Sequence, residues 1–138
     1  MKRERFVKVA VWLLGLVAAF GLGTAIGQQT PPKENKGFVT GSTTVIDLGP
    51  EIDGMQGRQL RMRVLTLEPG GVVGLHSHKD RPAVVHLLQG TLTEHKENAA
   101  SVEHQKGAMW GEGKATTHWA ENKGNVPAVF VAADIFKP

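Results

Sequence analysis

From Phe38 onward, the chain alternates between short apolar runs and breaks rich in glycine and polar residues. The runs show no 3.6-residue period, and several follow the two-residue alternation of a strand with one buried face. The predicted strands are Thr43–Leu48, Leu60–Glu68, Val72–His76, Val84–Leu88, Thr91–His95, Val102–Gln105, Ala108–Trp110, His118–Glu121 and Ala128–Phe136. Eight or nine short strands in one small domain predict an all-β sandwich or closed barrel, whose interior would hold any site.

A different pattern occupies the N-terminus, where Val9–Ile26 contains no charged residue and follows a basic stretch. This order is typical of a secretory signal peptide, with a cut before Gln28. The apolar run is also nearly long enough to span a bilayer, so an uncleaved signal-anchor helix remains the alternative. Both alternatives place the rest of the chain in the periplasm, either free or anchored to the inner membrane.

The predicted organisation is therefore a signal peptide or anchor over residues 1–27, a polar linker over 28–37 and one domain over 38–138. The linker is assigned from its polar composition and from the pair Pro31-Pro32.

Charge alone would favour a nucleic-acid partner, because 16 Lys+Arg face 13 Asp+Glu and the formal charge is +3. Four of those basic residues, however, lie in the first eight positions (Lys2, Arg3, Arg5 and Lys8), beside Glu4 alone. The remaining chain is formally neutral, so we expect no nucleic-acid partner and membrane contact only through the N-terminal segment. The chain has no cysteine, which excludes disulfides and thiolate metal sites.

Among six histidines, His76 and His78 stand out because residues at i and i+2 on a strand point to the same face. Two imidazoles placed in this way form a two-nitrogen clip for a metal ion. The interpretation for His95 and His104 is a surface or capping role, and for His86 partly buried packing.

The surroundings of this pair resemble the cupin family. Residues 70–90 resemble its first motif, G-x5-H-x-H-x3–4-E-x6-G, and residues 107–122 its second, G-x5-P-x-G-x2-H-x3-N. In the second motif Gly107, His118 and Asn122 match, whereas Gly113 and Ala115 replace the proline and the second glycine. The resemblance implies a jelly-roll barrel (a double-stranded β-helix), in agreement with the number of predicted strands.

Carried over residue by residue, the resemblance gives the metal ligands His76, His78 and His118. The metal-binding glutamate of the family falls on Ala83, so no carboxylate is carried over. Nearby carboxylates that could replace it are Asp80, expected to be solvated, and Glu94 and Glu112, considered for their proximity alone. The three imidazoles predict one divalent metal ion, either Fe, Mn, Ni, Cu or Zn.

Two functions remain open. The first is a metal-dependent enzyme, of the dioxygenase type by resemblance, that acts on a small organic molecule. The second is a non-catalytic module that binds a small ligand or a metal. A homodimer is expected from the resemblance alone.

Further expectations concern the interior. The candidate lining residues are Met62, Val85, Leu87, Ala120 and the strand over 128–136. Arg61 and Arg63 are assigned to a solvated strand face. Trp119 should face away from His118, and Gly74 should mark a bulge or a close backbone approach.

Overall fold

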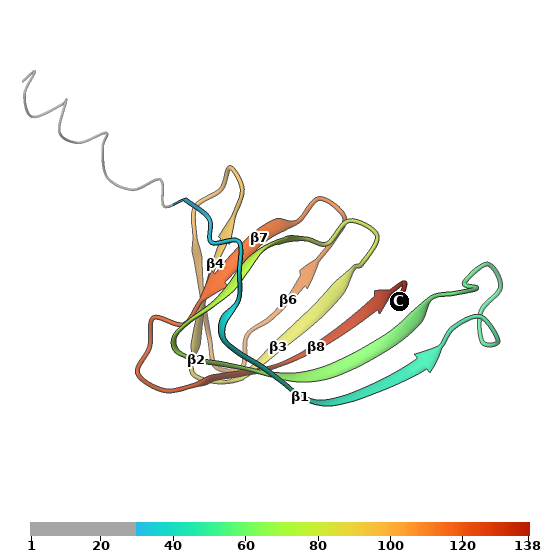
Figure 1. Ribbon diagram of the computed structural model, residues 1–138, viewed down its shortest axis with the longest axis horizontal. Coiled ribbons are helices and arrows are strands. Elements are labelled where there is room, and N and C mark those ends of the chain that lie inside the picture. Colours follow the sequence, from blue (N-terminus) through green and yellow to red (C-terminus); the bar gives the residue numbers. More distant parts are fainter. Residues whose placement is uncertain (1–29) are drawn as a thin grey trace, which may run out of the picture. The chain divides into compact units, whose positions relative to one another are not determined.

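Strands make up the regular secondary structure of residues 30–138, the part of the chain that the computed structural model describes (Figure 1). The strands are β1 (Lys36–Asp47), β2 (Gln59–Ser77), β3 (Ala83–Gln89), β4 (Thr91–Lys96), β5 (Val102–Gln105), β6 (Met109–Glu112), β7 (Thr117–Glu121) and β8 (Ala128–Phe136). The expected signal peptide or anchor over 1–27 lies outside the described residues. Within them, no helix has the length and apolar character to cross a bilayer.

All strand pairs are antiparallel, and they join into one curled sheet in the order β5-β4-β7-β2-β8-β3-β6, with β1 paired to β2. The long strand β2 is central to this arrangement (Figure 1). Its first half pairs with β1 and β8, and its last part pairs with β7. Because a curled sheet encloses its concave face, the side chains on that face meet in one interior. The all-β expectation is confirmed, and the curled sheet is consistent with a jelly roll.

The two predicted strands Leu60–Glu68 and Val72–His76 are a single strand in the structure. The Pro69-Gly70-Gly71 segment was expected to end the pairing, but the chain bends there and continues. Gly70 takes a φ of 71°, a conformation that glycine adopts without steric cost. The bend is tied to the end of β7, because Gly70 N–H donates to the Asn122 carbonyl and Asn122 N–H donates to the Gly71 carbonyl.

The apolar core lies between the two halves of the curled sheet. It is formed by buried residues of five strands, namely Leu65, Leu67, Val85, Leu87, Leu92, Ala120, Ala128, Phe130 and Ala132. Phe38, Val73 and Trp110 pack against it. Polar side chains such as Arg63 and Glu94 share this inner face with the core residues of their own strands.

In the first half of β2, the residues that face the interior are the ones expected to face solvent, and the reverse. Met62, expected to line the interior, is 49% exposed, and Arg61 and Arg63 share the face of the buried Leu65 and Leu67. Side chains at i and i+2 point the same way, so the core leucines fix the arginines on the inner face. The assignment of the two arginines to a solvated face was therefore wrong.

Residues 32–36, which belong to the expected linker, contact β2 beside Gly74. Leu75 N–H donates to the Pro32 carbonyl (2.7 Å), and Gly74 N–H donates to Asn35 Oδ1 (2.9 Å). A Cβ at Gly74 would lie 2.7 Å from the Lys33 carbonyl oxygen, so only glycine fits. The pairing of β2 with β7 also slips by one residue between Val73 and His76. The expected bulge and close approach at Gly74 are both confirmed.

Candidate metal centre

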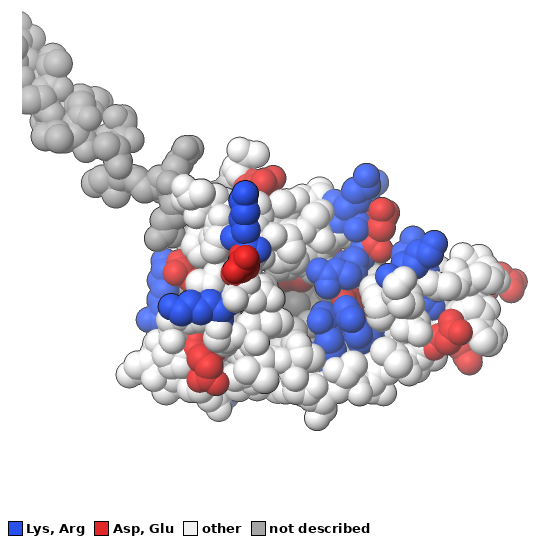
Figure 2. Space-filling model, viewed as in Figure 1, with Lys and Arg blue, Asp and Glu red and all other residues white. Residues whose placement is uncertain are grey.

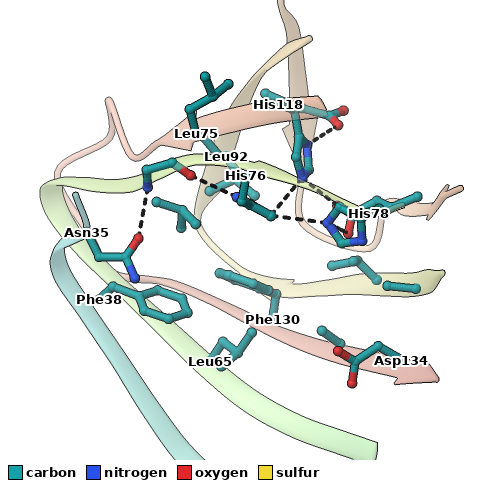
Figure 3. Close-up of a pocket in the computed structure, with 18 of the residues that line it drawn as sticks. Asn35, Phe38, Leu65, Leu75, His76, His78, Leu92, His118, Phe130 and Asp134 are labelled. Carbon is teal, nitrogen blue, oxygen red and sulfur yellow. Dashed lines mark hydrogen bonds and ion pairs between the residues drawn. The ribbon is translucent and has the colours of Figure 1, made fainter. Parts of the chain in front are cut away.

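Three histidines meet in the interior, one each on the adjacent strands β2 and β7 and one directly after β2 (Figure 3). His76 lies directly opposite His118 in the β2–β7 register, and His78 follows the end of β2. The Nε2 atom of His76 is 3.1 Å from that of His78 and 3.0 Å from that of His118. The structure thus brings together the three histidines that the resemblance singles out.

The opposite ring nitrogen of each histidine faces a fixed acceptor. His76 Nδ1 donates to the Gly74 carbonyl (2.8 Å), His78 Nδ1 to the Arg81 carbonyl (3.1 Å) and His118 Nδ1 to Glu94 Oε1 (2.7 Å). Because carbonyl and carboxylate oxygens only accept, each Nδ1 carries the proton. In the neutral form, each ring with its proton on Nδ1 presents the Nε2 lone pair toward the other two rings.

Burial keeps two of these rings neutral. Desolvation lowers the pKa of His76, and it lowers the pKa of His78 to about 4, although a backbone hydrogen bond opposes it in both cases. At neutral pH both side chains are accordingly in the unprotonated form that binds metal ions.

The Glu112 carboxylate lies beside two of the three rings. Glu112 Oε2 is 3.0 Å from His78 Nε2, and Glu112 Oε1 is 3.7 Å from His118 Nε2. Glu112 on β6 lies directly opposite Ala83 on β3. Directly opposite residues in an antiparallel pair point to the same face with their Cβ atoms about 5 Å apart. A carboxylate therefore lies beside the histidines although position 83 is alanine, and it belongs to Glu112, one of the nearby carboxylates considered from the sequence.

A second buried carboxylate supports the ring of His118. Glu94 is 2% exposed and also accepts a hydrogen bond from His104 Nε2 (3.0 Å). Burial alone would raise the pKa of Glu94, but the hydrogen bonds from His118 and His104 outweigh it and lower the pKa to about 2. Glu94 is therefore ionised at neutral pH, and it fixes the ring orientation of His118.

Trp110 connects the two carboxylates. Its indole Nε1–H donates to Glu112 Oε1 (2.9 Å), and its ring stacks on His104 with 3.8 Å between centroids. His104 was expected at the surface, but it belongs to this supporting network. Trp119 is buried on the other side of its strand, stacked on His95, as expected.

The open end of the interior forms a cavity of about 350 Å³ in front of the histidines. Of the expected lining residues, Val85, Ala120, Phe130 and Ala132 line it, whereas Leu87 is wholly buried in the core. Charged residues also line it: Asp134 belongs to the strand expected to line the interior, whereas Lys33, Arg63 and Arg81 were not expected there.

Strand alternation could have given several of these residues more weight in the sequence. Glu94 follows Leu92 by two positions, and Arg63 precedes Leu65 by two, so both continue the phase of a core residue. Glu112 likewise follows Trp110, which packs against the core, by two positions, and the register of β6 with β3 places it opposite Ala83.

The donor set fits a divalent metal ion. Two donors at about 2.1 Å from one ion, as usual for imidazole nitrogen and carboxylate oxygen, lie roughly 3.0–3.4 Å apart. The Nε2 and Oε2 atoms described above are 3.0–3.1 Å apart. Lone pairs at this separation repel one another unless a cation or a proton lies between them. Three imidazoles and one carboxylate suit Fe, Mn, Ni, Cu or Zn.

Solved structures share the fold at low sequence identity. A protein of Thermotoga maritima described as a predicted oxalate decarboxylase is 22% identical, with a TM-score of 0.54, and the match covers 82% of this chain and 99% of that one. A Klebsiella pneumoniae protein with a double-stranded β-helix domain is 15% identical, with a TM-score of 0.54 and coverage of 80% and 81%. A sugar phosphate isomerase of the cupin superfamily from Silicibacter pomeroyi is 19% identical, with a TM-score of 0.50 and coverage of 67% and 66%.

No relative was found among curated proteins. The family model described as a cupin domain matches residues 63–134, a span that contains all three histidines, both buried glutamates and the whole strand pair β3–β6. The match covers half of the chain, and the antiparallel curled sheet agrees with it. The chain therefore belongs to the cupin family.

Proposed function

We propose that this protein is a metal-dependent enzyme that acts on a small organic molecule in its barrel cavity, with His76, His78, His118 and Glu112 as the metal ligands. The observation that carries the proposal is the convergence of three Nε2 lone pairs, each fixed by an acceptor at the opposite nitrogen. A bound divalent ion would supply Lewis-acid chemistry and, if redox-active, the means to react with dioxygen.

The protein side chains would hold the metal ligands in position and orient a small substrate beside them. Glu94 keeps the proton of His118 on Nδ1, so that Nε2 stays available as a ligand. Trp110 holds Glu112 Oε1, which directs Oε2 toward His78. Val85, Phe130 and Ala132 form an apolar wall that excludes water from a small substrate.

Among metal-dependent enzymes, we favour an oxygenase of the dioxygenase type. Four protein ligands would leave room at a bound metal ion for a further ligand, and the cavity next to the histidines could hold that ligand.

The first test is elemental analysis of the full-length protein beside His118→Ala. The control variant is His86→Ala, because His86 is on β3 and does not line the metal-centre cavity. We expect about one redox metal ion per wild-type and per His86→Ala chain, and a large loss of metal in His118→Ala. Oxygen uptake with a panel of small aromatic and sulfur compounds then tests turnover.

Two results would contradict the proposal. Metal that is absent from the wild type, or retained equally by His118→Ala, excludes the histidine centre. Stoichiometric metal without oxygen uptake or other turnover of the panel would instead support the non-catalytic binding module.

A further inference from the structure

Three arginines converge on one carboxylate at the open end of the interior. Asp134 accepts two hydrogen bonds from Arg61, from Nε at 3.0 Å and from Nη2 at 2.7 Å. Its Oδ2 atom also faces Arg63 Nη2 at 3.3 Å and Arg81 Nη1 at 3.4 Å. The carboxylate is 2% exposed and neutralises one of the three positive charges. This cluster therefore retains a net positive charge and more donors than acceptors.

The three arginines differ in what they face. Arg61 forms the bidentate pair and lies over the Phe136 ring, with its guanidinium carbon 3.9 Å from the centroid. It does not line the cavity, whereas Arg63 and Arg81 do. Figure 2 shows basic side chains gathered beside a hollow on the face in view.

Arg63 has a donor left over. Its Nε is buried and has no hydrogen-bond acceptor among residues 30–138. A buried N–H without an acceptor is unfavourable, and such groups in folded proteins usually meet a ligand, an ion or water. A guanidinium presents its N–H groups as a planar fork that matches the two oxygens of a carboxylate or a phosphate.

We propose that Arg63 and Arg81 bind the oxyanion group of a small organic ligand, a carboxylate or a phosphate, whose remainder occupies the cavity toward the histidines. Asp134 holds the two guanidiniums in place and limits their mutual repulsion. Figure 3 shows Asp134 apart from the histidine cluster, on the strand that carries Phe130, so anion and metal ion would be held on different parts of the cavity wall. This proposal rests on the proposed function in one respect only, namely that the anionic ligand and the metal ion occupy the same cavity.

The test is calorimetric titration of the full-length protein with acetate, inorganic phosphate and the neutral isostere acetamide. Metal-loaded and chelator-treated samples are compared, and the metal content of each variant is measured separately. We expect acetate or phosphate to bind in both samples and acetamide to bind in neither. The tighter of the two anions identifies the group as a carboxylate or a phosphate.

The variants are Arg63→Gln, Arg81→Gln and the matched control Arg61→Gln. All three remove one positive charge from the same carboxylate, but Arg61 does not line the cavity. We expect anion affinity to fall about tenfold or more in Arg63→Gln and Arg81→Gln and by less than about threefold in Arg61→Gln, with metal content unchanged. Arg63→Lys, which keeps the charge but loses the fork, should give an intermediate affinity.

Several outcomes would overturn the inference. Equal losses in all three glutamine variants would mean a general charge effect, and equal binding of acetamide would exclude an anion site. If anion binding is lost in the chelator-treated sample and is unchanged in the arginine variants, the anion binds to the metal instead. Absence of binding of either anion also overturns it.

Arg81 is the most exposed of the three arginines, so the Arg81→Gln variant serves if Arg63→Gln fails to fold. Because metal content is measured in the same samples, failure of the metal centre is distinguished from failure of the anion site.

Discussion

The two ends of β2 contribute opposite chemistry to one cavity. Near its C-terminal end, His76 and His78 donate through Nδ1 and present lone pairs, which suits a cation. In its first half, Arg63 lines the cavity with a buried Nε that has no acceptor among the described residues, which suits an anion. Both kinds of group donate to an acceptor behind them, but a neutral imidazole then presents a lone pair, whereas a guanidinium presents further N–H groups and a positive charge. The atoms left facing the cavity therefore decide which charge each end attracts.

The largest expected effect is a loss of metal affinity on removal of Glu112, the carboxylate beside the histidines. Glu112→Ala should lower metal affinity by about 100-fold or more, because one of four ligands is lost. The double variant Ala83→Glu with Glu112→Ala should regain most of that loss, because the two positions lie opposite each other. Metal titration by competition with a chromogenic chelator measures both affinities. A double variant no better than Glu112→Ala would argue against Glu112 as the substitute for a residue-83 ligand.

The carboxylate behind His118 is expected to have the next largest effect. Glu94→Gln should lower metal affinity about 10–100-fold, because a neutral amide holds the ring less firmly and lowers its basicity. The matched control is Glu121→Gln, since Glu121 also accepts from a histidine (His95, 2.8 Å) but does not line the cavity. The same competition titration applies, and equal losses in the two variants would refute a specific role for Glu94.

At the arginine end the expected effect is on stability. Asp134→Asn leaves three guanidiniums without a counter-charge and should lower the free energy of unfolding by about 2 kcal/mol, discounted because the arginines are partly exposed. Urea unfolding at pH 7 measures this loss. Asp53→Asn, in an exposed turn, is the control.

The difference in the free energy of unfolding between wild type and Asp134→Asn should depend on pH. Burial would raise the pKa of Asp134, but the three arginines outweigh it and lower the pKa below its usual value near 3.8. A carboxylate with a lowered folded-state pKa stabilises the protein above its unfolded-state pKa and loses that contribution as the pH falls. The difference between wild type and Asp134→Asn should therefore shrink below about pH 4. A difference that stays constant down to pH 2 would contradict the charge argument.

The smallest effect is expected at Trp110. Trp110→Phe keeps an aromatic ring against His104 but removes the Nε1–H that holds Glu112. One hydrogen bond to a partly buried carboxylate corresponds to roughly 1 kcal/mol, so metal affinity should fall by a few-fold to about tenfold. Isothermal titration with the metal alone measures it, and an unchanged affinity would remove Trp110 from the supporting network.

Local sequence predicted the strands well, because alternation and glycine breaks act within one segment. It also predicted the histidine pair, since i and i+2 positions share a strand face. It missed the continuity of β2 through Gly70, because the hydrogen bonds that sustain the bend come from Asn122, far along the chain. It gave Glu112 little weight for the same reason, since a cross-strand register brings Glu112 to Ala83.

The placement of the arginines was wrong for another reason. Leu60, Met62 and Val64 alternate with Arg61 and Arg63 and resemble a buried stripe, because charged side chains are mostly exposed in folded proteins. Asp134, directly opposite Arg61 on β8, compensates the buried charge, and no property of β2 alone reveals it.

The pairing of Ala83 with Glu112 has a consequence for how such centres can change over time. A ligand that is exchanged across one rung of an antiparallel ladder moves 29 positions in the chain while its carboxylate stays near the same point in space. Two substitutions suffice, and a chain that carries both glutamates or neither would be the intermediate. Spatial neighbourhood across a sheet, rather than order along the sequence, is then the level at which ancestry of the centre can be traced.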